Sequence, residues 1–161
     1  MDLQQLFAMQ KELDSYIQSN RRIDEDVFDK KGLALLVELA ELANETRSFK
    51  FWSTKGPSER SIILEEYVDS IHFLLSLGIE KKLDALASWP EPNGKQELTQ
   101  LFLLTQKSIL EFLESHSMSS YQEVWSWYGA IAMALDFEYE EVLEAYILKN
   151  QKNYERQNNG Y

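Results

Sequence analysis

Apolar residues recur at the spacing of an α-helix along almost the whole of this 161-residue chain. Residues 33–43 read Leu-Ala-Leu-Leu-Val-Glu-Leu-Ala-Glu-Leu-Ala, and residues 62–77 are as rich in Ile, Leu and Val. Only 6 glycines and 3 prolines are present, and no segment alternates apolar and polar residues as a half-buried strand does. The pattern predicts an all-α fold, a helical bundle of about five to six helices.

Breaks in the pattern separate the expected helices. Gly56-Pro57-Ser58 and the run from Trp89 to Gly94 mark turns. Ser120 and Glu123 have the spacing of a capping box, and Asp136 can cap the last helix. The helices are expected at about 2–19, 31–47, 59–79, 96–115, 120–134 and 137–157. A chain of this length is expected to form a single domain over residues 1–161.

Charge and composition restrict the partners. With 16 basic and 27 acidic residues the net charge is −11, which argues against non-specific binding to nucleic acid or to an anionic membrane. No apolar run reaches the roughly 18 residues of a membrane span, and the N-terminus does not resemble a signal peptide. The chain has no cysteine, so disulfides and thiolate metal sites are excluded. We expect a cytoplasmic protein with no nucleic-acid or membrane partner.

Two pairs of carboxylates interrupt the most apolar segments. Glu38 and Glu41 are three residues apart in one, and Glu66 and Asp69 are three apart in the next. On a helix each pair projects from one face, and consecutive helices joined by a short turn pack antiparallel, so the pairs can meet. Unpaired carboxylates are costly to bury unless a cation compensates them. Four oxygen donors suit Mg²⁺, with Mn²⁺ as a substitute. The alternative is that Glu38 and Glu41 lie on an exposed edge.

Other polar and aromatic residues have two interpretations each. Gln10 interrupts the apolar stripe of the first helix and could bind a ligand or make a structural hydrogen bond. An aromatic residue in the segment 49–55 could stack on a base or enter the core. The cations and amides of the last helix could bind phosphate or form a solvated terminus. That last set comprises Lys149, Asn150, Asn153 and Arg156.

These residues carry a family resemblance. Glu38-x-x-Glu41, 24 further residues and Glu66-x-x-Asp69 resemble the all-α nucleoside triphosphate pyrophosphatase superfamily, which includes the MazG proteins. Further matches resemble its dimeric dUTPase branch. They are Gln10-x-x-Leu13, Lys50-Phe51-Trp52, His72-Phe73 and Lys149-Asn150-x-x-Asn153-x-x-Arg156-Gln157-x-x-Gly160-Tyr161.

The resemblance implies hydrolysis of dUTP, with dUDP as a further substrate, to dUMP, with release of pyrophosphate from dUTP and metal-bound water as the nucleophile. It implies that Glu41 also orients or deprotonates that water, and that the protein is a homodimer in which the second chain contributes to the site. The remaining roles that it implies are Mg²⁺ binding by Glu38, Glu41, Glu66 and Asp69, phosphate binding by Lys149, Asn150, Asn153 and Arg156, and binding of base and sugar by Gln10, Lys50, Trp52 and Phe73.

The sequence also allows two other functions, and it indicates where a dimer would form. A pyrophosphatase of the same superfamily acting on another nucleotide would share the metal motif. A non-catalytic helical binding protein could keep the acids as a structural metal site. Residues 96–135 carry apolar bulk without site residues, so they are the expected dimer surface.

Overall fold

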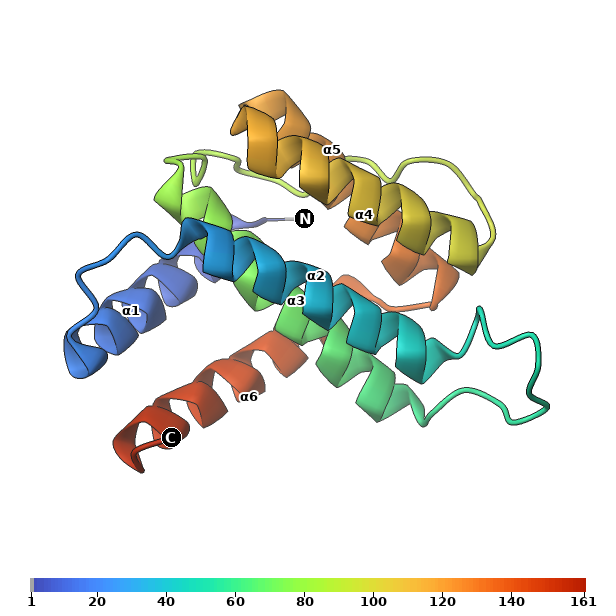
Figure 1. The fold of residues 1–161 in the computed structure, drawn as a ribbon, viewed down its shortest axis with the longest axis horizontal. Coiled ribbons are helices and arrows are strands. Elements are labelled where there is room, and N and C mark those ends of the chain that lie inside the picture. Colours follow the sequence, from blue (N-terminus) through green and yellow to red (C-terminus); the bar gives the residue numbers. More distant parts are fainter. Residues whose placement is uncertain (1) are drawn as a thin grey trace.

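The computed structural model describes residues 2–161 and shows six helices arranged as a bundle (Figure 1). Within these residues there is no strand, and no helix is long and apolar enough to cross a membrane. The predicted all-α bundle is confirmed. The helices are α1 (Gln4–Arg21), α2 (Phe28–Thr46), α3 (Arg60–Glu80), α4 (Leu98–Ser115), α5 (Met118–Ala134) and α6 (Tyr139–Asn158).

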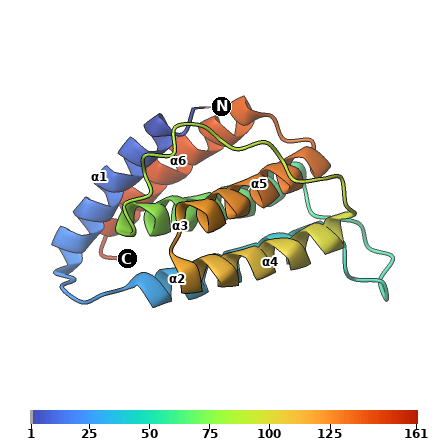
Figure 2. The same ribbon diagram turned by 90° about the horizontal axis from the view of Figure 1, so that it is seen from above.

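The helices form three layers of two (Figure 2). One layer consists of α1 and α6, the central layer of α3 and α5, and the third of α2 and α4. α2 and α3 are consecutive and pack as an antiparallel hairpin, and so do α4 and α5. α3 therefore touches helices of both outer layers, which explains why its sequence is apolar on nearly every side.

Aromatic hydroxyls connect α3 to α5 across the central layer. The Tyr67 hydroxyl donates a hydrogen bond to the Tyr128 carbonyl at 2.8 Å, and the Tyr121 hydroxyl donates to the Leu74 carbonyl at 2.8 Å. Gly78 lies directly beneath Tyr121, where a Cβ atom would overlap the tyrosine hydroxyl. These contacts fix the rotation of α3, so that its acidic residues lie toward α2 and α6.

Two details of helix capping were predicted wrongly. Ser117 is the N-cap of α5 and accepts a hydrogen bond from the Ser120 backbone amide, so the helix begins before the expected Ser120. His116, the C-cap residue of α4, adopts the left-handed conformation, and it and Ser117 are the two residues between the helices. The capping box belongs to α6, between Glu138 and Glu141, and Asp136 does not cap that helix.

Candidate functional site

Three acids from α2 and α3 meet at the face between these helices. One ligand atom from each of Glu38, Glu66 and Asp69 lies within 4.8 Å of the others, and all three side chains are half-buried. The antiparallel hairpin brings them together because it sets the middle of α2 against the first half of α3. Glu41, the fourth predicted ligand, is exposed and lies beside this group without joining it.

Burial and mutual repulsion shape the charge of the cluster. Burial, then the negative charge of Asp69 and the contacts with Glu41, raises the pKa of Glu38 to about 8. Burial also raises the pKa of Glu66 and of Asp69, and neighbouring carboxylates add to both shifts. The Oε2 atom of Glu38 is buried and has no hydrogen-bond partner among the described residues. A convergent set of oxygen donors with an orphaned carboxylate oxygen fits a hard divalent cation.

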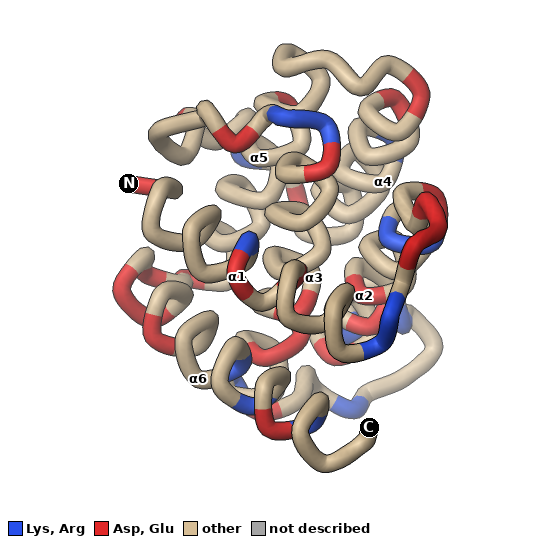
Figure 3. Tube along the Cα trace, turned by 90° about the vertical axis from the view of Figure 1, so that its left-hand side faces the viewer, with Lys and Arg blue, Asp and Glu red and all other residues tan. Residues whose placement is uncertain are grey.

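Lys149 of α6 is the cation closest to the acids. Its Nζ atom donates hydrogen bonds to Asp69 at 2.8 Å and to Glu65 at 3.0 Å. Burial alone would lower the pKa of Lys149, but the hydrogen bonds and charges of Asp69 and Glu65 outweigh it, so the pKa is raised. Figure 3 shows the basic positions of α6 beside the acidic positions of α3. Lys149 therefore compensates Asp69, whereas Glu38 has no cationic partner among the described residues.

A cavity of about 570 Å³ opens next to the cluster, among α1, α2, α3 and α6. Its wall is partly apolar and partly polar, with Leu13 and Ile17 on α1 and several ionisable groups on the other helices. The volume is in the range of a small-molecule site. Seven of the predicted site residues line it: Gln10, Glu38, Asp69, Phe73, Lys149, Asn153 and Arg156.

Other predicted residues lie away from the cavity. Asn150 is 5% exposed and does not line it, and its amide nitrogen has no partner among the described residues. Lys50 and Trp52 belong to the loop between α2 and α3, at the far end of the hairpin (Figure 1), and Trp52 is 65% exposed. Phe73 lies thirteen positions after Arg60 in α3, about 20 Å along the helix. One chain by itself therefore does not bring Trp52 to Phe73.

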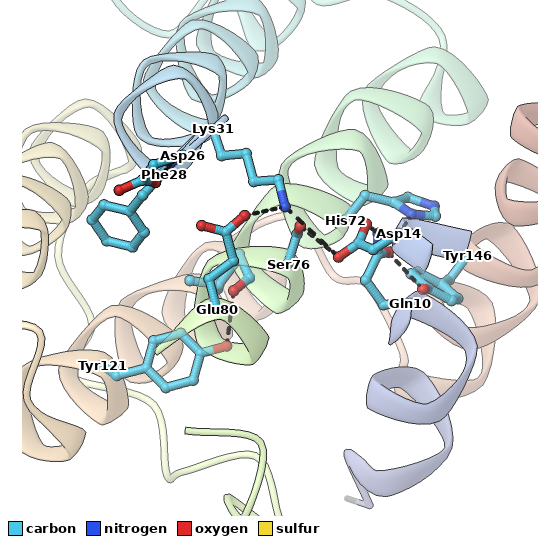
Figure 4. Close-up of polar contacts among 11 residues, drawn as sticks. Gln10, Asp14, Asp26, Phe28, Lys31, His72, Ser76, Glu80, Tyr121 and Tyr146 are labelled. Carbon is cyan, nitrogen blue, oxygen red and sulfur yellow. Dashed lines mark hydrogen bonds and ion pairs between the residues drawn. The ribbon is translucent and has the colours of Figure 1, made fainter. Parts of the chain in front are cut away.

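Behind Gln10 lies a polar network that the sequence did not reveal (Figure 4). Its members come from α1, α2, α3 and α6, and they line the inner wall of the cavity or lie just behind it. The spacing Gln10–Asp14 on α1 and the series His72, Ser76 and Glu80 on α3 place each set on one helical face, a signal that could have identified part of it. The network comprises Gln10, Asp14, Lys31, His72, Ser76, Glu80 and Tyr146.

Comparison with known proteins assigns the chain to a family. A family model described as dUTPase matches residues 2–161, whereas no curated protein gives a significant match. Because the match spans the full length, the chain belongs to the all-α dUTPase family, whose members are dUTP diphosphatases that hydrolyse dUTP to dUMP.

Proposed function

We propose that this member of the dUTPase family hydrolyses dUTP, and also dUDP, to dUMP in a Mg²⁺-dependent reaction at the cluster of α2 and α3. Family membership supports the overall reaction. The location rests on one observation: Glu38, Glu66 and Asp69 converge within 4.8 Å beside a cavity of nucleotide size. Such a group of acids is stable when a divalent cation compensates its charge.

In this proposal the three converging acids hold Mg²⁺, or Mn²⁺ in its place. The bound ion would neutralise the polyphosphate and make water more acidic. Glu41 is the fourth acid of the site, and its exposed carboxylate, which contacts Glu38, would orient the attacking water and accept its proton. Separate roles for Glu41 and the other three acids follow from their different burial.

The nucleotide would lie along the cavity from the acids toward α1. Lys149, Asn153 and Arg156 of α6 would bind the phosphates, which requires Lys149 to exchange its contact with Asp69 for a phosphate oxygen. Gln10 and Phe73, farther along the wall, would contact the base and sugar. Asn150, buried beside the phosphate-binding residues, would support that part of α6.

We further propose a homodimer formed through α2 and α4. These packed helices expose large apolar side chains: Leu33 is 64% exposed, Val37 47%, Leu103 62% and Leu110 52%. The α4 residues fall within the predicted dimer surface at 96–135. In such a dimer Lys50 and Trp52 of one chain would reach the cavity of the other. The protomer would act as one cytoplasmic domain, and its net charge of −11 disfavours nucleic-acid and membrane partners.

The first test is release of dUMP from dUTP with Mg²⁺, with and without excess EDTA. Wild type should be active only with the metal, Glu41→Gln should lose at least about 100-fold in kcat, and Glu144→Gln should match wild type because Glu144 is an exposed acid of α6 that lies outside the cavity and the proposed dimer surface. Turnover unaffected by EDTA would refute the metal site. Faster turnover of dCTP, dTTP or UTP would refute the preference for dUTP, and no turnover of any nucleotide would favour a binding protein.

A further inference from the structure

The side-chain amide of Gln10 is held in one orientation. It is 3% exposed, and its Nε2 atom donates a hydrogen bond to Asp14 Oδ1 at 2.8 Å. Asp14 also accepts a hydrogen bond from the Ser76 hydroxyl at 2.6 Å, and Lys31 lies 4.0 Å away (Figure 4). A carboxylate among three donors is an acceptor, so it selects the NH₂ side of the Gln10 amide. The carbonyl side must then point away from Asp14.

That carbonyl oxygen determines which nitrogen of His72 carries the proton. Gln10 Oε1 lies 2.7 Å from His72 Nδ1 and accepts a second hydrogen bond from the Tyr146 hydroxyl at 2.8 Å. Because an amide oxygen can only accept, Nδ1 of His72 must donate. Burial, followed by the positive charge of Lys149, lowers the pKa of His72 to about 3, so the ring is neutral. A neutral ring with a proton on Nδ1 has a free lone pair on Nε2.

This Nε2 atom has no partner. It is buried, and no described residue makes a hydrogen bond to it. The His72 ring is held in place by stacking on Tyr146, with ring centroids 4.2 Å apart, and the residue lines the cavity with Gln10 and Phe73. Buried polar atoms without partners are uncommon in folded proteins, and one in the wall of a cavity can receive a hydrogen bond from a bound ligand or an ordered water.

We propose that Asp14 is a positioning residue for nucleotide binding, which acts through the Gln10 amide to keep His72 in the Nδ1–H tautomer and so present Nε2 as a hydrogen-bond acceptor for the nucleoside. The donor from the ligand is an N–H or O–H group, either the imide N–H of the base or the 3′-hydroxyl of the sugar. This role rests on the proposed nucleotide-hydrolysing function and extends it to the far wall of the cavity.

The tautomer can be measured directly by ¹⁵N NMR of the imidazoles. The chain has only two histidines, which makes assignment simple. His116 provides an internal reference for a protonated Nε2 atom, because its Nε2 atom lies 2.8 Å from the Leu113 carbonyl oxygen and donates a hydrogen bond to it. The expected result at neutral pH is an Nδ1–H tautomer for His72. An Nε2–H tautomer in the wild-type protein would overturn the proposal without any substitution.

Variants at position 14 test the positioning role. Asp14→Leu removes the acceptor that orients Gln10, so His72 should become a mixture of tautomers and KM for dUTP should rise about tenfold, with kcat changed less than about threefold. Asp14→Asn keeps an oxygen for Gln10 and should restore both the tautomer and most of KM. Ser76→Ala, which leaves the Asp14–Gln10 bond intact, should keep the tautomer. A pure Nδ1–H tautomer and an unchanged KM in Asp14→Leu would overturn the proposal.

Ligand titrations test the acceptor role and identify the donor. Adding dUMP should shift the Nε2 resonance of His72. Loss of that shift with N3-methyl-dUMP would assign the donor to the base, and loss with 2′,3′-dideoxy-UMP would assign it to the sugar. No shift with any nucleotide would overturn the role. The role would also be overturned if the Nε2 atom of His72 were already hydrogen-bonded in the ligand-free protein and lost that hydrogen bond in Asn150→Ala. Failure of the wild type to hydrolyse dUTP would count against the proposed function, whereas the tautomer is read independently of turnover.

Discussion

Replacing Glu38 by glutamine is expected to stabilise the metal-free protein. Glu38 is half-buried beside Glu66 and Asp69, and its Oε2 atom lacks a partner among the described residues. Burial and the neighbouring acids raise its pKa from 4.5 to about 8. A neutral amide of the same shape removes the repulsion without leaving a cavity. The substitution therefore separates the effect of the acidic cluster on stability from its proposed role in metal binding.

The sign and size of this effect follow from the pKa. Between pH 4.5 and about 8 the folded state holds the Glu38 proton more tightly than the unfolded state, so the free energy of unfolding falls as the pH rises. At about 1.36 kcal/mol per pH unit, the full difference corresponds to at most about 5 kcal/mol. Because Glu38 is only half-buried, solvent screening reduces the expected value to about 2 kcal/mol. That corresponds to roughly 4–8 °C in Tm for a chain of this size.

The assay is thermal unfolding in EDTA at pH 5 and at pH 8.5. The Tm of Glu38→Gln should exceed that of wild type at pH 8.5 and differ little from it at pH 5, whereas Glu144→Gln controls for the loss of one negative charge at an exposed site. Adding Mg²⁺ at pH 8.5 should raise the Tm of wild type more than that of Glu38→Gln. A variant less stable than wild type at pH 8.5 in EDTA would refute the electrostatic account of the cluster.

Three further substitutions and one control probe other parts of the molecule. Gly78→Ala places a methyl group against the Tyr121 hydroxyl and should cost about 1–3 kcal/mol in urea unfolding, whereas Gly56→Ala, with open space around it, should stay within about 0.5 kcal/mol. Leu110→Glu should convert the proposed dimer to a monomer in light scattering. Trp52→Ala should raise KM for dUTP without changing Tm, because its exposed ring adds little to the core.

The fold could be predicted because its determinants are local. Helical spacing, two turns and the apolar stripes are properties of neighbouring residues, and so is the antiparallel packing of α2 against α3. The predicted ends of the helices were less accurate because each end depends on a few residues at the junction between two helices. α5 begins at Met118 because His116 adopts a left-handed conformation, which no residue pattern around Ser120 specifies.

The acidic site was partly predictable from spacing, but its detail depends on the rotation of each helix. Both Glu65 and Glu66 could have faced α2. The structure turns Glu66 toward Glu38, whereas Glu65 pairs with Lys149 and Lys152 on α6. The contacts between α3 and α5 set this rotation, and they join residues 47 to 61 positions apart.

The partners of Gln10 on other helices could not be predicted for the same reason. Gln10 bonds to His72, 62 residues away, and to Tyr146, 136 residues away. A single sequence shows a buried amide in an apolar stripe but not the groups that satisfy it. Only the packing of α1 against α3 and α6 identifies those partners.

Lys149 lies between the acids and the proposed phosphate-binding side of the cavity, and we expect it to make the two halves of the proposed site depend on each other. In this structure its Nζ atom is hydrogen-bonded to Asp69 and so would compete with a divalent cation for that carboxylate. Nucleotide phosphates that attract Lys149 would release an Asp69 oxygen. A non-hydrolysable dUTP analogue should therefore increase the affinity of the wild-type protein for Mg²⁺ in titration calorimetry. The increase should be smaller in Lys149→Met, because position 149 no longer competes with the cation in that variant. Equal increases in the two proteins would show that Lys149 does not couple the cation to the nucleotide.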